Sequence, residues 1–361
     1  MMGERRPGRA ARRVPGRVAF LLGLVVLAVV GAAVAAVAAG LPDRWFESHA
    51  LPTTIAVGFD PAGVAVDPTA HRAYVTSEGE GDGTVTVLDT IRNAVVASVR
   101  VGKYPAHGVA VDSAAHRAYI TSSHGVSVID TQRNVIVATI DLTFNPAGVA
   151  VDPTAHRAYA VVPGVNVVHV LDTRTNADVA TIRVGDLKWL SFGSASVAVD
   201  PVAHRAYVTI SRVGHFSAHG VPTSSVAVLD TDATLVVDTI PVGRTPAGVA
   251  VDPAAHRVYV TNQDGDSVSV IDTQRDVAVA GIRVGAFPTG VAVDPAAHRA
   301  YVTNSHGNSV SVIDTRRNAV VATLPVGRGP VAVAVDPATH RVYVANYADG
   351  TISVLQGGAG S

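Results

Sequence analysis

The sequence predicts an all-β fold in which seven four-stranded blades close into a ring, and three observations support this prediction. One phrase recurs seven times, each copy holds four short runs with apolar residues in period two, and a strand missing from the last copy stands near the beginning of the chain. A four-stranded unit of this size cannot bury both faces alone, whereas radial stacking covers each sheet with its neighbours. The predicted architecture is therefore a seven-bladed β-propeller.

The first element in chain order is an N-terminal targeting segment. Residues 1–17 form a basic region with six arginines against one acid, and an uncharged apolar run follows over residues 18–41. A helix of this length is roughly 36 Å long, enough to cross a hydrocarbon core of about 30 Å. The arginines predict that residues 1–17 stay in the cytoplasm, which makes the protein a single-pass membrane protein with its propeller outside. Small residues near position 35 also fit a cleaved signal segment, in which case the protein is secreted.

The recurring phrase follows a predicted linker over residues 42–52. In its fifth copy it reads Gly248-Val-Ala-Val-Asp-Pro-Ala-Ala-His-Arg-Val-Tyr-Val-Thr-Asn, which gives strand A, a tight turn and strand B. Ser267-Val-Ser-Val-Ile-Asp then gives strand C, and Ala280-Gly-Ile-Arg-Val-Gly gives strand D. The histidine of the turn returns in every copy, at His71, His116, His156, His204, His256, His298 and His340.

The ends of the repeat predict how the ring closes. The last copy stops after strand C, at residues 351–355, and lacks strand D. Residues 53–58 precede the first strand A and match the strand D phrase of the other copies. We therefore expect the two segments to pair, so that the propeller spans residues 53–356 and residues 357–361 form a flexible tail.

The repeat resembles the YVTN β-propeller family, whose tetrapeptide stands here as Tyr259-Val-Thr-Asn and Tyr301-Val-Thr-Asn. The resemblance covers about residues 53–355. It implies a cell-surface or periplasmic seven-bladed propeller and implies no particular reaction.

A residue found in every blade serves every blade, so the seven histidines are interpreted as structural. They are expected to bond a backbone carbonyl or the strand C aspartate, such as Asp272. The strand B tyrosines are expected to pack between neighbouring sheets with their hydroxyls in water.

Departures from the repeat indicate where function lies, because loops on a rigid frame collect binding groups. Blade 4 has a long connection before its strand A and an enlarged loop between strands B and C, at residues 185–193 and 211–222. We expect these loops to be the main recognition site. The candidate ligand-binding residues on this face are Trp189, Phe192, His215, Phe216, His219, His107, Tyr104, His124 and His306.

No cofactor is predicted. The loop histidines offer ligands that copper or zinc accepts, but the spacing of His215 and His219 does not align them on one metal. The acidic stretch at residues 78–82 offers oxygens suited to calcium, and a flexible solvated loop is the favoured account of it. The chain has no cysteine, so thiolate sites are excluded.

The sequence favours a binding module at the cell surface over an enzyme, because it contains no recognisable catalytic motif. Its ligand would be a protein, a peptide or a small molecule. The alternative is a propeller enzyme resembling lyases, lactonases or quinone-dependent dehydrogenases, acting through the loop histidines. Nucleic acid is not expected as a partner, because residues 53–361 carry a net charge of −5 and the whole chain has only two lysines.

Overall fold

The computed structural model describes residues 52–79, 82–103, 105–123, 125–184, 195–211 and 224–357, which belong to one compact unit. The predicted basic region, the apolar segment at 18–41, almost all of the linker and the tail beyond Gly357 lie outside the described residues. Among the described residues, no helix has the length and apolar character needed to traverse a bilayer.

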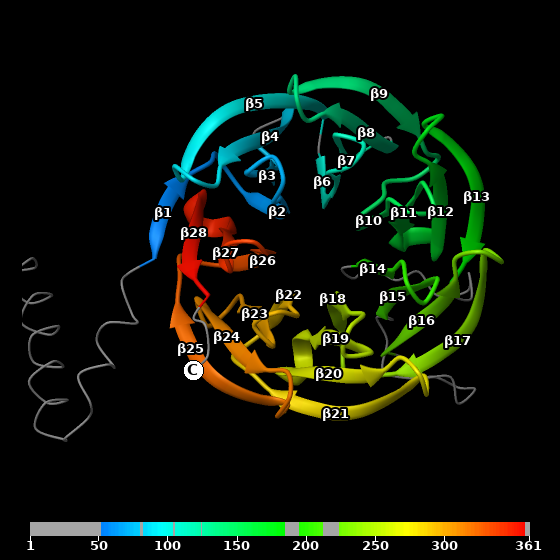
Figure 1. Cartoon of the computed structure of the whole chain (residues 1–361), viewed down its shortest axis with the longest axis vertical. Helices are drawn as coiled ribbons and strands as arrows, with labels where there is room; N and C mark the ends of the chain where they lie inside the picture. The colour runs from blue at the N-terminus through cyan, green and yellow to red at the C-terminus, as the bar shows by residue number, and fades with distance from the viewer. Residues whose placement is uncertain are drawn as a thin grey trace, which may run out of the picture. The chain divides into compact units, whose positions relative to one another are not determined.

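The predicted seven-bladed β-propeller is confirmed: seven antiparallel four-stranded sheets are arranged around a central axis (Figure 1). Blade 1 consists of β2 (Pro61–Asp67), β3 (Arg72–Ser77), β4 (Asp82–Asp89) and β5 (Ala94–Lys103); blade 2 of β6 (Pro105–Asp112), β7 (Arg117–Ser122), β8 (Gly125–Asp130) and β9 (Val135–Asp141); and blade 3 of β10 (Val149–Asp152), β11 (Arg157–Val162), β12 (Val167–Asp172) and β13 (Ala177–Arg183). Blade 4 consists of β14 (Val197–Asp200), β15 (Arg205–Ser211), β16 (Ser224–Asp230) and β17 (Leu235–Pro241); blade 5 of β18 (Pro246–Asp252), β19 (Arg257–Asn262), β20 (Ser267–Asp272) and β21 (Val277–Arg283); and blade 6 of β22 (Pro288–Asp294), β23 (Arg299–Asn304), β24 (Ser309–Asp314) and β25 (Ala319–Pro325). Blade 7 consists of β26 (Pro330–Asp336), β27 (Arg341–Asn346), β28 (Thr351–Gln356) and β1 (Thr53–Ala56).

The ring closes between the two ends of the chain, as the sequence predicts. β1 is the outermost strand of blade 7 and pairs antiparallel with β28, with Ile55 opposite Ile352. Val57 continues the ladder, because its N–H donates to the carbonyl oxygen of Gly350 at 3.0 Å. Blade 7 therefore contains strands from both ends of the described chain.

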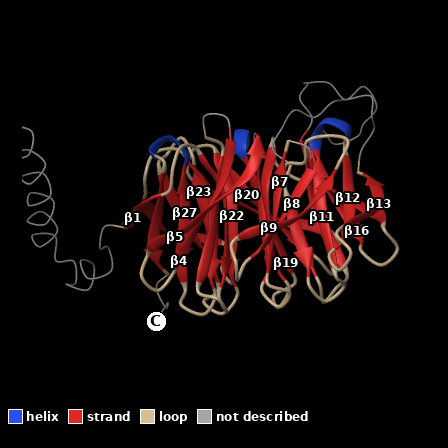
Figure 2. Ribbon diagram, turned by 90° about the horizontal axis from the view of Figure 1, so that it is seen from above, coloured by secondary structure: helices blue, strands red, loops and turns tan. Residues whose placement is uncertain are grey.

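The two rims of the ring differ in their connections. Three short 3₁₀ helices, η1 (Pro163–Val165), η2 (Gln263–Gly265) and η3 (Tyr347–Asp349), join strands B and C on one rim (Figure 2). The tight turns between strands A and B and between strands C and D lie on the other rim. We call the first rim the mouth face and the second the turn face.

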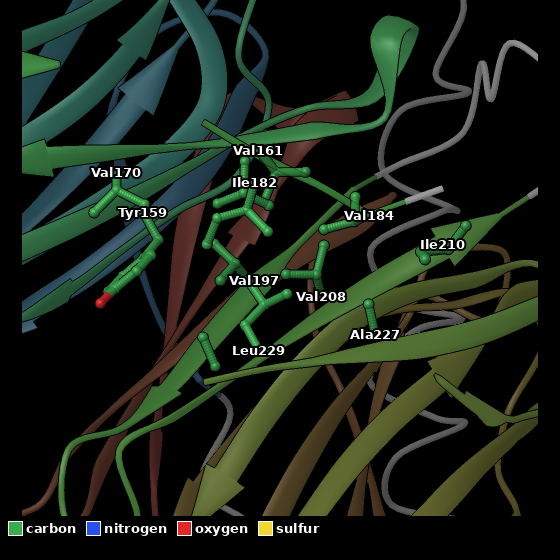
Figure 3. Packing of buried hydrophobic residues seen from close by; sticks show 12 residues of the cluster. Tyr159, Val161, Val170, Ile182, Val184, Val197, Val208, Ile210, Ala227 and Leu229 are labelled. Atoms are coloured by element: carbon green, nitrogen blue, oxygen red, sulfur yellow. The ribbon is translucent and has the colours of Figure 1, made fainter. Parts of the chain in front are cut away.

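Side chains from neighbouring blades form the hydrophobic core. In the cluster of Figure 3, Tyr159, Val170 and Ile182 of blade 3 pack against Val208 and Leu229 of blade 4. Equivalent clusters lie between the other pairs of neighbouring blades. Valine suits these positions because its branched side chain fills a pleated surface, and each sheet is covered by the next around the circle.

The strand B tyrosines pack between blades, but their hydroxyls do not reach water as we expected. Tyr74, Tyr119 and Tyr259 are fully buried, and their hydroxyl oxygens are enclosed. Burial raises the pKa of each of these tyrosines to about 12. The expectation was wrong because each of these three rings lies beside a threonine of the turn between strands C and D of the next blade, at Thr131, Thr173 and Thr315. Tyr343 likewise donates to the carbonyl oxygen of Thr90 in blade 1 at 3.3 Å.

Candidate functional site

Strand A of every blade lines the axis (Figure 1), and in blades 2, 4 and 5 a threonine of strand B donates a hydrogen bond to the next blade. In blade 5 the hydroxyl of Thr261 accepts the N–H of Gly248 at 2.8 Å and donates to the carbonyl oxygen of Thr289 in blade 6 at 2.7 Å. A Cβ atom added to Gly248 would lie 2.4 Å from that same oxygen. The threonine of the recurring phrase thus joins adjacent blades, and the glycine permits their close approach.

An axial cavity of about 500 Å³ results from this arrangement. Its volume lies within the range of about 300 to 1,000 Å³ that is usual for small-molecule sites. The wall consists mainly of small and apolar residues at and next to strand A, and three larger side chains, Gln263, Phe287 and Tyr347, stand at the mouth. The lining residues are Ala62, Gly63, Val64, Gly108, Val109, Ala147, Gly148, Val149, Ala195, Ser196, Ala247, Gly248, Val249, Gln263, Phe287, Thr289, Gly290, Val291, Ser305, Val331, Ala332, Val333 and Tyr347.

Two loop positions build the mouth in blades 1, 5, 6 and 7. The first is the residue directly after strand B, and the second is the residue before the proline that begins strand A. The N–H of Ser305, at the first position in blade 6, donates to the carbonyl oxygen of Phe287, at the second, at 3.0 Å. Gln263 makes the same bond to Thr245 in blade 5 at 2.9 Å, and Tyr347 makes it to Gly329 in blade 7 at 3.0 Å.

Phe287 is held in an unusual backbone conformation at this mouth. Its φ of 54° lies in the left-handed region, which is disfavoured for a bulky side chain. Its N–H donates to Oδ1 of Asp266 at 2.9 Å. Its ring stacks on the imidazole of His306, with the ring centroids 4.3 Å apart and the planes at 14°. Such strained residues cluster at binding sites, where the surrounding contacts impose the conformation.

The mouth is acidic at the junction of blades 7 and 1. The hydroxyl of Tyr347 donates to Oε2 of Glu78 at 3.4 Å, across the junction of blades 7 and 1. Burial raises the pKa of Tyr347, and the carboxylates of Glu78 and Asp60 raise it further. The phenol therefore remains a hydrogen-bond donor at neutral pH.

Gln263 is the most enclosed polar group of the mouth. Its residue is 9% exposed, and its side-chain amide forms no hydrogen bond to the described part of the chain. Directly before it, Asn262 donates its amide to the hydroxyls of Ser267 and Ser269, and Gly243 packs against the same amide. This network fixes the end of strand B and hence the position of Gln263.

Of the predicted ligand-binding residues, the structure describes the side chain of His306 alone, and it places that side chain against Phe287 at the mouth. His107 lies in β6, but its side chain is outside the description. The remaining predicted residues fall outside the described ranges: Tyr104, His124, Trp189, Phe192, His215, Phe216 and His219. Sequence reasoning missed Gln263 and Ser305. The sequence feature that could have identified them is that the residue directly after strand B varies from blade to blade, although the phrase before it repeats.

The repeated histidines lie on the turn face, and their backbone makes most of the contacts. All seven have φ between 51° and 56°, a conformation that histidine adopts more readily than most residues. In blade 5 the carbonyl oxygen of His256 accepts the N–H of Thr273 at 3.2 Å and Nη1 of Arg257 at 2.8 Å. The expected bond from this histidine to Asp272 is not formed, because Nη1 of Arg257 donates to Oδ2 of Asp272 at 2.9 Å instead.

The same arginine to aspartate pair joins strands B and C in four further blades. It connects Arg72 with Asp89, Arg117 with Asp130, Arg157 with Asp172, and Arg299 with Asp314. In blade 3, backbone hydrogen bonds and Arg157 lower the pKa of Asp172 to about 2. Among the imidazoles, that of His340 binds Oδ2 of Asp294 in the preceding blade at 2.6 Å.

Metal ligands do not gather anywhere in the described ranges: no group of three histidine or acidic side chains is placed to hold an ion. The acidic stretch considered for calcium falls partly outside those ranges, since residues 80 and 81 and the side chain of Asp82 are not described. The loop histidines considered for copper or zinc are also outside them, apart from His306.

Comparison with known proteins identifies the fold. No family model matches the chain, and no curated protein matches its sequence. Among solved structures, hydrazine synthase from Kuenenia stuttgartiensis is similar, with a TM-score of 0.72 over 83% of this chain and 96% of the other. The sequence identity is 21%, so this similarity defines the class of protein, a seven-bladed β-propeller, and does not extend to the reaction.

Proposed function

We propose that this propeller is a non-enzymatic binding module whose site is the axial cavity and the loops of the mouth face. The single observation that carries the proposal is an uncharged cavity of about 500 Å³ whose entrance combines a fixed aromatic ring with an enclosed amide. Apolar walls with a few placed polar groups are typical of ligand sites.

The residues of the cavity favour binding over catalysis. Its described lining contains no carboxylate, imidazole, lysine or arginine, which leaves the phenol of Tyr347 as the one described lining group that general acid or base chemistry could use. His306 is exposed and lies against Phe287 rather than in the cavity. The alternative of an enzyme that uses the loop histidines gains no support from this site.

The loops of blade 4 remain part of the proposed recognition surface. Residues 185–194 connect β13 to β14, and residues 212–223 connect β15 to β16. Connections of these two kinds build the mouth in the described blades, so we propose that Trp189, His215 and the other candidates in these segments contact the same ligand or its carrier. Membership of the YVTN family is proposed on the repeat phrase and the propeller fold.

We also propose that the module works outside the cytoplasm, anchored to the membrane through residues 18–41. The supporting observations are the arginine-rich start and the uncharged apolar run that follows it. Protease treatment of intact cells should degrade the propeller, and alkaline extraction should leave it with the membrane. Recovery of the propeller in the medium would indicate cleavage, and full protection in intact cells would contradict export.

A cavity-filling variant tests the binding site. A neutral apolar dye, N-phenyl-1-naphthylamine, should bind the full-length chain in detergent and give a higher fluorescence than the same detergent without protein. Val331→Phe places a ring in the cavity and should abolish this rise, whereas Val202→Phe, at a residue that is 82% exposed on the turn face, should preserve it. Dye binding that is equal in both variants would refute the proposed site.

A further inference from the structure

We propose that the axial cavity binds an uncharged ligand that presents a carboxamide-like edge, one donor beside one acceptor, to the side chain of Gln263. The proposal rests on the function proposed above and specifies its ligand class. Amides, lactams, ureas and the peptide group itself have such an edge. A flat apolar body attached to that edge would lie against Phe287.

The unpaired amide of Gln263 is the first argument. The residue is 9% exposed and lines the cavity, and its side-chain amide has no hydrogen-bond partner in the described part of the chain, so water or a ligand in the cavity must complete its hydrogen bonds. The glutamine side chain offers an NH₂ donor and a carbonyl acceptor side by side. A ligand amide matches both groups at once, whereas a carboxylate matches only the donor and an amidinium only the acceptor.

The uncharged lining of the cavity is the second argument. Its described residues include no acid, imidazole, lysine or arginine, whereas Asp264 and Asp266 lie in the mouth loops, where they accept hydrogen bonds from Thr245 and Phe287. A charged ligand group held against this described lining would lose its water without gaining a counterion there, which is costly in an apolar site. The cavity therefore selects neutral groups.

The rigidity of the mouth is the third argument. Phe287 is fixed by its backbone hydrogen bonds to Asp266 and Ser305 and by its stacking on His306. Gln263 is fixed at its backbone by the bond to Thr245 and by the network around Asn262. A site whose groups are held before binding loses little conformational entropy when the ligand arrives.

Three probes of the same shape test the ligand class: 2-naphthamide, 2-naphthoate and 2-naphthamidinium. Binding is measured by calorimetry on the full-length chain in detergent. We expect the amide to bind at least about tenfold more tightly than either charged probe. Equal or tighter binding of a charged probe would overturn the inference.

Substitutions at Gln263 test the contact itself. Gln263→Leu should remove the preference for the amide, and Gln263→Glu should shift it toward the amidinium. Gln274→Leu, the same change at an exposed residue on the turn face of the same blade, should leave all three affinities unchanged. Phe287→Ala should weaken the binding of all three probes together, with Ile91→Ala, at an exposed residue of the turn face, as its control. Unchanged melting temperatures establish that each variant folds.

The outcomes separate the two proposals. Binding of the neutral dye that Val331→Phe abolishes would support the binding site. A preference for the amide that survives both Gln263→Leu and Gln263→Glu would then refute the ligand class and leave the binding site in place. Failure of all three naphthyl probes at a site that binds the dye would also refute it. Failure of the dye would refute the binding site itself.

Discussion

The buried tyrosines predict that the propeller unfolds cooperatively in alkali. Six of them have a pKa of about 12, at Tyr74, Tyr119, Tyr159, Tyr207, Tyr259 and Tyr301, and burial is the first cause in each. The unfolded chain titrates its tyrosines near pH 10. Because the folded-state pKa is the higher one, the stability from the neutral phenols is complete below pH 10 and is lost as the pH rises toward 12.

The size of this loss follows from the shift. Between pH 10 and 12 each phenol lowers the free energy of unfolding by about 1.4 kcal/mol per pH unit. Six phenols together lower it by about 8 kcal/mol by pH 11, which is comparable to the whole stability of many folded proteins, about 5 to 15 kcal/mol. We therefore expect a sharp transition near pH 11 in which several protons are released together.

Circular dichroism and phenolate absorbance, followed in one titration from pH 9 to pH 12, measure this behaviour. Strand structure should disappear as phenolate appears, and both should be steeper in pH than a single ionisation. Tyr259→Phe should move the midpoint to higher pH, while Tyr347→Phe, at the partly exposed mouth, should move it less. Phenolate that forms gradually near pH 10 while the strand signal persists would refute the reasoning.

Three further predictions concern the ring itself. Ile55→Ala should lower the free energy of unfolding in urea by about 2 to 5 kcal/mol, because Ile55 is 8% exposed and lies in the strand that pairs with β28. Ile91→Ala, at a residue that is 61% exposed, should change it little. Equal effects of the two substitutions would contradict closure by this strand. Gly248→Ala should lower the free energy of unfolding by about 1 to 3 kcal/mol, since the new Cβ would lie 2.4 Å from a carbonyl oxygen of the next blade. An unchanged free energy of unfolding would show that the two blades can move apart to admit the methyl group. The φ of His256 is 52°, in the left-handed region, which asparagine adopts far more readily than valine. His256→Asn should therefore leave thermal stability nearly unchanged, whereas His256→Val should lower the free energy of unfolding by about 1 to 2 kcal/mol or more. A reversed order would refute a backbone role for this residue.

The sequence was sufficient to predict the ring and its closure. Both follow from repetition, since a strand missing at one end and present at the other has one place to pair. The pairing of Ile55 with Ile352 therefore needed no information beyond the phrases themselves. The exported location and the membrane anchor stay predictions, because residues 1–51 are not described.

The side-chain partners were harder to predict because they depend on geometry that repetition does not encode. Histidine and arginine are adjacent in every copy, and the sequence does not tell which one reaches Asp272; the left-handed backbone at His256 and the reach of Arg257 decide it. The tyrosine hydroxyls depend on turns of the following blade. Gln263 was missed because a single neutral residue in a short loop carries no motif, and its importance comes from burial.

Closure through the chain ends has a mechanical consequence. The four residue pairs between Thr53 and Ala56 and the opposite strand join the first described strand to the last. Any pull applied between an N-terminal attachment and a load at the C-terminus reaches this ladder before it reaches a blade interface. The resistance of the ring to such a force then depends on one short ladder, and lengthening β1 would strengthen the closure while leaving the other six blades unchanged.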